Sequence, residues 1–257
     1  MEATGFSACA IVPVFNHEKA VPDVIRSILA LSLPVIIVDD GSSPDCQTVL
    51  QQMSNRHENV RLVALPKNRG KGAAVKSGLL VAQEMGFSHA IQIDADGQHT
   101  VKDATTFLAA ALATPEALVC GFPQYDVTVP KLRFYARYLT HVWVWINSLS
   151  LSIKDTMCGF RVYPVTAINR LIKNMPSGDR MEFDSEIMVY WVWQQGTVIN
   201  LPTAVSYPAD GESHFKPWRD NYLISKMHAR LFFGMLWRLP SLLAAKFGRG
   251  KRVGKHV

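Results

Sequence analysis

Two carboxylates, Asp94 and Asp96, stand two residues apart directly after the apolar run 89–93. A strand that ends in this way brings two oxygen ligands together, and hard divalent cations such as Mg²⁺ prefer oxygen ligands. These ions also bind substrate phosphates, so the pair indicates a site for a metal ion and a diphosphate. Asp and Gly are ordinary turn residues as well, and a solvated acidic turn is the alternative interpretation.

The elements that must position these carboxylates alternate regularly along the first half of the chain. Apolar runs predict strands, and amphipathic runs between them predict helices. This alternation predicts an α/β fold with a mainly parallel sheet flanked by helices on both faces. We expect strands at Ala8–Val14, Val35–Asp40, Val60–Leu65, Ala90–Asp94 and Ala117–Gly121, and helices at His17–Leu33, Pro44–Arg56, Gly72–Met85 and Thr100–Ala113.

Three polar clusters fall at the carboxyl ends of the predicted strands: Pro13–Asn16, Asp39–Ser42 and Asp94–Gln98. Ligands of open parallel sheets bind beyond these strand ends, so we expect the three clusters to line one crevice. Asp39 is expected to serve as a turn or helix-cap aspartate rather than as a direct ligand.

The segment Asn68–Gly72 resembles a phosphate-binding loop, but the spacing G-x-x-x-x-G-K-[ST] is absent. No G-x-G-x-x-G follows the first predicted strand either, so both common nucleotide motifs are excluded. Two interpretations of the segment stay open: a turn that leads into a helix, and a phosphate contact in which Lys71 reaches the crevice.

The composition is that of a globular protein. The chain has 257 residues, 48% hydrophobic and 19% charged, and shows no sign of extended disorder. Its four cysteines are far apart and lack metal-ligand spacing, which favours a reduced, cytoplasmic protein over a disulfide scaffold. The first residues lack a basic region followed by an apolar one, so we expect no secretory signal.

The net charge of +6 is concentrated near the end of the chain. Residues 213–257 contain ten Lys or Arg and one acidic residue, Asp220, whereas residues 1–212 are slightly acidic. Such a basic segment favours an anionic partner, either nucleic acid or a membrane surface. No nucleic-acid recognition motif accompanies it, so the membrane is the expected partner.

Residues 219–247 predict a helix rich in aromatic residues. Its charges interrupt the apolar positions, and no run reaches the ~18 apolar residues of a spanning helix. We therefore expect an amphipathic helix at the membrane interface, in a segment 217–257 that follows a catalytic domain 1–216. The alternative is a helix packed on the body of the protein.

Seven segments, in this order and spacing, resemble the family 2 glycosyltransferases of the GT-A fold, in particular the dolichyl/polyprenyl-phosphate mannose synthase branch. They are Ile11–Asn16, Ile37–Ser42, Asn68–Gly72, Asp94–Gln98, Asp155–Arg161, Met181–Asp184 and Gly211–His214. The resemblance implies an inverting glycosyltransferase that moves a sugar from a nucleotide-diphospho-sugar to a lipid-linked acceptor. Together with the amphipathic, basic segment, it leads us to expect a peripheral enzyme on the cytoplasmic membrane face, without a nucleic-acid partner.

The resemblance also implies the donor site. The nucleotide would be bound by Pro13, Phe15, Val38, Asp40, Lys71, Asp94, Ala95 and Asp96, with Asp40 accepting a hydrogen bond from the base. The divalent metal, Mg²⁺ or Mn²⁺, would be held by Asp94, Asp96, Gln98 and His214. For His214, metal ligation, donation to the β-phosphate and loop capping stay open.

Arg133, Arg137 and His141 are spaced i, i+4, i+8 and form one polar stripe if the segment is helical. The expected acceptor site consists of Arg133, Arg137 and Arg161. The alternatives are a solvated helix edge for the stripe and a loop-ordering role for Arg161.

Glu182, Asp184 and Glu186 form the second carboxylate cluster. Asp96 and Asp184 are the predicted catalytic residues, with Asp184 as general base if the acceptor is a hydroxyl. A phosphate acceptor is already ionised and requires no base.

Two other functions are compatible with these residues. A metal-dependent nucleotidyltransferase also combines a parallel sheet with aspartate-bound metal. A non-catalytic module that binds sugar nucleotides or membranes would use the same clusters without turnover.

Overall fold

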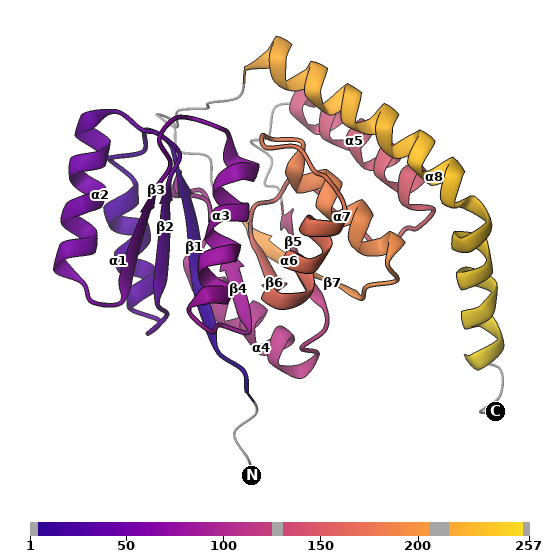
Figure 1. Ribbon diagram of the computed structural model, residues 1–257, viewed down its shortest axis with the longest axis horizontal. Helices are drawn as coiled ribbons and strands as arrows, with labels where there is room; N and C mark the ends of the chain where they lie inside the picture. Colours follow the sequence, from indigo (N-terminus) through magenta and orange to yellow (C-terminus); the bar gives the residue numbers. More distant parts are fainter. Residues whose placement is uncertain (1–4, 125–130, 206–215, 254–257) are drawn as a thin grey trace.

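The computed structural model describes residues 5–124, 131–205 and 216–253, with only the backbone of 131–136 and 247–253. Its centre is a seven-stranded sheet in the order β3-β2-β1-β4-β6-β5-β7 (Figure 1). β6 runs antiparallel to both neighbours, and the other described pairs are parallel. The strands are β1 (Ala8–Val14), β2 (Val35–Asp39), β3 (Val60–Ala64), β4 (His89–Gln92), β5 (Leu118–Gln124), β6 (Arg161–Pro164) and β7 (Val198–Ala204). The predicted, mainly parallel α/β fold is confirmed.

Helices cover both faces of the sheet, because side chains of successive strand residues point to opposite sides. In β2, Ile36 and Val38 join one buried cluster, and Val35 and Ile37 join the other. The first cluster contains residues of α3 (Lys71–Glu84), α6 (Val165–Asn174), α7 (Phe183–Trp193), α5 (Lys131–Ser148) and α8 (Pro217–Val253); the second contains residues of α1 (Val21–Leu29), α2 (Pro44–Arg56) and α4 (Ala104–Ala113).

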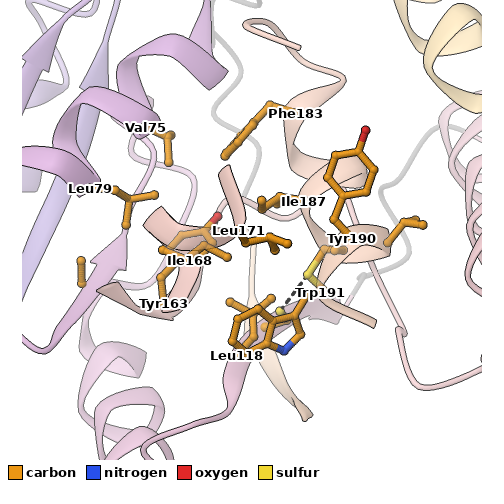
Figure 2. Close-up of a cluster of buried hydrophobic side chains, with 14 of the residues drawn as sticks. Val75, Leu79, Leu118, Tyr163, Ile168, Leu171, Phe183, Ile187, Tyr190 and Trp191 are labelled. Carbon is orange, nitrogen blue, oxygen red and sulfur yellow. Dashed lines mark hydrogen bonds between the residues drawn. The ribbon is translucent and has the colours of Figure 1, made fainter. Parts of the chain in front are cut away.

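The first cluster joins α3, α6 and α7 over the sheet (Figure 2). Gly78 lets α3 approach β1 closely, because a Cβ at this position would lie 2.5 Å from Cγ2 of Ile11. The small residues of α3 therefore set its distance from the sheet. The first residue of this helix, Lys71, is placed accordingly.

Two predicted helices begin later than expected. The helix predicted at 17–33 is limited to α1, with Pro22 in its first turn. Proline lacks the N–H that an interior helical position needs, which favours a helix start at this point. The segment predicted as helix from Thr100 begins with a 3₁₀ turn, Val101–Asp103, before α4.

α8 is 37 residues long, about 55 Å at the usual helical rise. It lies beside α5, and its last part bends away from the body of the protein (Figure 1). Pro240 lies inside the helix, and proline is a usual cause of such bends. Its inner face buries Met227, Leu231, Met235 and Leu242 in the first cluster. Among the described residues we find no helix with the length and hydropathy of a membrane span.

All four cysteines are free and buried. Cys9 and Cys120 belong to the first cluster, and Cys46 and Cys158 belong to the second. Each face of the sheet therefore contains two thiols. Burial raises the pKa of Cys9, Cys120 and Cys158 to about 12.

Candidate active site

The carboxyl ends of β1 and β2 are joined by hydrogen bonds between their polar clusters. Oδ1 of Asn16 accepts from the backbone N–H of Ser43 at 2.8 Å, and Oγ of Ser42 accepts from the N–H of Asn16 at 3.2 Å. Asp39 closes the turn by accepting from the N–H of Ser42 at 2.9 Å, the turn role expected for it. The first two predicted clusters therefore meet at this edge of the sheet.

Asp40 orders the turn before α3. One carboxylate oxygen accepts from the N–H of Arg69 at 2.7 Å, and the other accepts from the N–H of Gly70 at 2.8 Å and from Nδ2 of Asn68 at 3.0 Å. Gly70 has φ +115° and passes so close to Arg180 that a Cβ would lie 2.4 Å from its Cγ, so only glycine fits. This turn delivers Lys71 to the first position of α3.

The Lys71 ammonium lies between two carboxylates from different parts of the chain. Its Nζ is 2.9 Å from Oδ2 of Asp94, beyond β4, and 3.0 Å from Oδ2 of Asp184, in the first turn of α7. Burial alone would lower the pKa of Lys71, but the charges of Asp184 and Asp94 raise it above its ordinary value. The ammonium is therefore protonated at neutral pH.

Asp94 lies against the backbone of Gly159, where a Cβ would be 2.1 Å from its Oδ2. Nε2 of His99 is 4.0 Å from the same oxygen. Burial alone would raise the pKa of Asp94, but the charge of Lys71 holds it below its ordinary value. Burial and the nearby charge of Asp94 raise the pKa of Asp96.

Two close, partly buried carboxylates of this kind suit a hard divalent cation, because the cation would offset their mutual repulsion. In the part of the chain that the structure describes, no group of three or more His, Cys, Asp or Glu side chains has the arrangement of a metal site. A cation at Asp94 and Asp96 would therefore take further ligands from substrate phosphates and water, as Mg²⁺ often does.

Asp155 orders the loop that carries Gly159. Its carboxylate accepts two hydrogen bonds from Arg137, at 2.6 and 2.7 Å, and bonds from the N–H groups of Met157 and Cys158. Nε2 of His141 lies 3.2 Å from it. Burial alone would raise the pKa of Asp155, but the neighbouring His141 and Arg137 hold it well below its usual range.

A protein-family model described as "Glycosyl transferase family 2" matches residues 9–172, which extend from β1 to α6 and include Lys71, Asp94 and Asp96 but not Asp184. The chain belongs to glycosyl transferase family 2. The family predicted from the seven segments is therefore confirmed, and the protein is a glycosyltransferase.

Curated relatives of this glycosyltransferase extend the match toward α8. A dolichyl-phosphate beta-glucosyltransferase of Dictyostelium discoideum is 26% identical over 255 residues, covering 90% of this chain and 76% of the relative. The enzyme of the same name from Drosophila melanogaster is 29% identical over 201 residues, covering 69% of this chain and 60% of the relative. An uncharacterized protein of Methanocaldococcus jannaschii is 27% identical over 80% of this chain and 90% of its own length.

Solved structures share the fold of this glycosyltransferase at low sequence identity. The glucosyl-3-phosphoglycerate synthase of Mycobacterium tuberculosis, solved with Mn²⁺, UDP-glucose and phosphoglyceric acid, has a TM-score of 0.63 at 17% identity, covering 90% of this chain and 79% of the other. A mannosyltransferase of Pyrobaculum calidifontis, solved with GDP-Man and Mn²⁺, has a TM-score of 0.54 at 16% identity, covering 95% of this chain and 75% of the other. The GT-A-like fold is thereby confirmed.

The structure of this glycosyltransferase brings together Lys71, Asp94 and Asp184 as donor-site and catalytic candidates. Pro13 and Ala95 are buried beside the crevice, and Phe15 is partly buried. Gln98 donates its backbone N–H to Oδ1 of Asp96 at 3.0 Å. His214 and the side chain of Arg133 lie outside the described residues.

Three predicted binding residues have other partners in the structure. The side chain of Val38 packs in the first core cluster and does not face the crevice. Asp40 was expected to bind the base, but both its oxygens bind the turn at 68–70. Arg137 was expected to contact the acceptor, but its guanidinium binds Asp155.

The contacts of Arg161 are compatible with the second of its two expected roles, loop ordering. Arg161 is fully buried, donates to the backbone carbonyl groups of Thr156 and Asp184, and lies 3.9 Å from Oδ1 of Asp184. Its guanidinium therefore links the loop that contains Thr156 to the first turn of α7, on the buried side of the crevice. The bond to the Asp184 backbone helps to position Asp184, and the acceptor role of Arg161 stays a prediction.

Sequence reasoning missed His99 and the role of Gly159. His99 directly follows the Asp94–Gln98 segment, and a histidine beside two aspartates is a recognisable ligand-type pattern. Its buried Nδ1 has no hydrogen-bond partner within the described residues. The contact of Gly159 with Asp94 joins residues 65 positions apart, so no local pattern indicates it.

Proposed function

We propose that this glycosyltransferase transfers a hexose from a nucleotide-diphospho-sugar to a polyprenyl-type lipid phosphate, with inversion at the anomeric carbon, at the cytoplasmic face of a membrane. Glucose is the first candidate sugar, because the named relatives are dolichyl-phosphate beta-glucosyltransferases. The observation that carries the choice of a phosphate acceptor is the environment of Asp184.

Asp184 is the candidate general base for a hydroxyl acceptor, yet one of its two oxygens is already engaged. Oδ2 forms an ion pair with Lys71 at 3.0 Å, and Oδ1 lies 3.9 Å from the guanidinium of Arg161. A general base needs a free oxygen within hydrogen-bond reach of the acceptor hydroxyl, and the Oδ2 oxygen of Asp184 is occupied by Lys71. A phosphate nucleophile is ionised before it arrives, so it suits a site whose candidate base is already paired.

The donor would lie across the ends of β1, β2 and β4. Asp94 and Asp96 would hold Mg²⁺ or Mn²⁺, and the bound ion would stabilise the charge that develops on the departing nucleoside diphosphate. An oxygen of the acceptor phosphate would attack the anomeric carbon as the bond to the diphosphate breaks on the opposite side. Lys71 is placed to balance negative charge between donor and acceptor.

The outer face of α8 would contact the membrane. Its exposed apolar side chains lie opposite the face that packs on the body of the protein, and Trp218 and Trp237 are 93% and 86% exposed. Aromatic side chains of this kind are typical of membrane interfaces. The exposed set is Trp218, Tyr222, Phe233, Leu236, Trp237 and Leu243.

Product analysis tests the proposed reaction. The protein would be incubated with Mn²⁺, with UDP-glucose or GDP-mannose, and with a polyprenyl phosphate or the matching polyprenol. We expect release of nucleoside diphosphate with the polyprenyl phosphate alone. Asp96→Asn should lower the rate about 10²–10³-fold, as loss of one stabilising group does in other enzymes.

Asp45→Asn, an exposed aspartate at the start of α2, is the matched control and should keep full activity. Faster transfer to polyprenol would contradict the phosphate acceptor and support Asp184 as a base. Pyrophosphate release would indicate a nucleotidyltransferase. Nucleotide binding without any transfer would favour a binding module.

A further inference from the structure

Lys71 links the donor side of the crevice to the opposite side. Asp94 follows β4 and Asp184 lies in the first turn of α7, and the two carboxylates share one ammonium at 2.9 and 3.0 Å. Within the described residues, Lys71 is the only Lys or Arg that forms an ion pair with Asp94, and its side chain is 16% exposed. This is a positioned cation, because the turn ordered by Asp40 fixes the start of α3.

We propose that Lys71 is an internal placeholder cation: it neutralises Asp94 in the nucleotide-free enzyme, yields Asp94 to the divalent ion, and turns to the incoming diphosphate. The inference rests on the metal site of the proposed function. The proposal gives Lys71 a role beyond nucleotide contact: Lys71 weakens the binding of a metal ion that arrives without a nucleotide.

The competition follows from the geometry around Asp94. Oδ2 is the oxygen that faces Lys71, and the same oxygen lies against Gly159, so it has little room to turn away. Oδ1 is 3.3 Å from Nε2 of Gln92. A metal ion at this carboxylate would meet the ammonium at close range, and like charges in a buried site repel strongly.

With a nucleoside diphosphate present, Lys71 should favour metal binding instead of opposing it. A metal ion that arrives with a nucleoside diphosphate brings negative charge, which the displaced ammonium can bind. Asp184 keeps its second cation, Arg161, when Lys71 moves. Lys71 should therefore weaken the binding of metal alone and strengthen the binding of metal with nucleotide. A residue with a purely structural role would weaken both.

The test compares Lys71→Met with Lys76→Met. Lys76 lies on the same helix, is similarly buried, and forms an ion pair with Asp179 at 2.6 Å, outside the crevice. Mn²⁺ binding would be measured by electron paramagnetic resonance, with Mn²⁺ alone and with Mn²⁺ plus UDP or GDP. In Lys71→Met, we expect Mn²⁺ alone to bind at least about tenfold more tightly, ~1.4 kcal/mol, and Mn²⁺ with nucleotide to bind more weakly. Lys76→Met should match the unmodified protein in both.

Equal or weaker binding of Mn²⁺ alone by a folded Lys71→Met would overturn the inference, as would the absence of Mn²⁺ binding in all variants. Circular dichroism would check folding, and Lys71→Gln would replace Lys71→Met if the latter does not fold. The measurement contains no acceptor and no transfer step. Loss of transfer to polyprenyl phosphate with the expected Mn²⁺ shifts would therefore refute the proposed acceptor and leave the role of Lys71 standing.

Discussion

At the residue scale, Gly159 sets the position of Asp94. Its missing side chain leaves room for the carboxylate, and a Cβ would lie 2.1 Å from Oδ2 and 2.4 Å from Oδ1. In Gly159→Ala, the Asp94 carboxylate must leave its present position, which disturbs its contact with Lys71 and the proposed metal site. We expect loss of Mn²⁺-dependent activity by about 10²-fold or more, measured as release of nucleoside diphosphate.

The control for this substitution is Gly86→Ala. Gly86 has φ +81° with open space around its Cβ position, so alanine there adds backbone strain far from the crevice. It should cost about 1 kcal/mol of folding free energy and leave the rate unchanged. A fully active Gly159→Ala would show that the carboxylate finds another productive position.

The candidate site was predictable only where local pattern determines a role. Asp94 and Asp96 end an apolar run, so their chemistry is visible in the sequence. The bridge from Lys71 to Asp184 spans 113 positions and depends on the approach of α7 to α3. An aspartate such as Asp40 could bind a ligand, but both its carboxylate oxygens accept hydrogen bonds from the turn at 68–70.

At the element scale, His228 joins α8 to α5. It is 7% exposed, and its Nδ1 lies 3.1 Å from Nδ2 of Asn147. Burial lowers the pKa of His228 to about 4 from 6.5. The unfolded chain therefore binds a proton at higher pH than the native protein, and folding stability falls as pH decreases from about 6.5 to 4.

This linkage should remove about 2–3 kcal/mol of folding free energy between pH 7 and pH 4. Urea denaturation at several pH values would measure it. His228→Gln lowers stability at neutral pH but should flatten the pH dependence in this range. His57→Gln, at the end of α2, should keep the slope of the unmodified protein. An unchanged slope in His228→Gln would assign the dependence to other groups.

The outer face of α8 permits a direct test of membrane contact. Phe233 and Trp237 are 69% and 86% exposed, whereas Arg230 and Arg238 tie the helix to the body through Glu186 and Trp193. Phe233→Ser with Trp237→Ser should therefore leave the helix in place and remove apolar contact area. We expect at least about tenfold weaker sedimentation with vesicles that contain anionic lipid, since each buried aromatic side chain contributes roughly 1.5–3 kcal/mol.

Leu80→Ser with Leu112→Ser is the matched control, because these leucines are exposed on α3 and α4. It should bind vesicles as the unmodified protein does. Equal binding by both double variants would exclude the outer face of α8 as the contact surface.

Among the elements, β6 was the least predictable. Its four residues form too short a run to predict, and the alternation of strands and helices predicts parallel strands, not an antiparallel one. Its antiparallel course is set by pairing with β4 and β5 and by the bond from the Tyr163 hydroxyl to Oε1 of Gln92, 2.9 Å long. The parallel strands were predictable because their apolar runs are bounded by turn residues.

At the scale of the whole molecule, the reversed direction of β6 explains how distant segments share one crevice. A strand that runs against its neighbours begins at the edge where they end. The loop 155–160 therefore enters β6 beside the carboxyl end of β4, and Gly159 meets Asp94 there. The seven-stranded sheet is in this way a single support for both sides of the site.

Two buried thiols lie on each face of the sheet, so their reactivity can report the opening of each helical layer separately. A thiol-reactive dye should leave the native state unmodified over minutes, and labelling should follow transient opening of the region around each cysteine. Mass spectrometry after pulsed labelling would then show whether Cys9 and Cys120 become reactive together with Cys46 and Cys158 or before them. Simultaneous reaction would mean that both helical layers detach in one cooperative event.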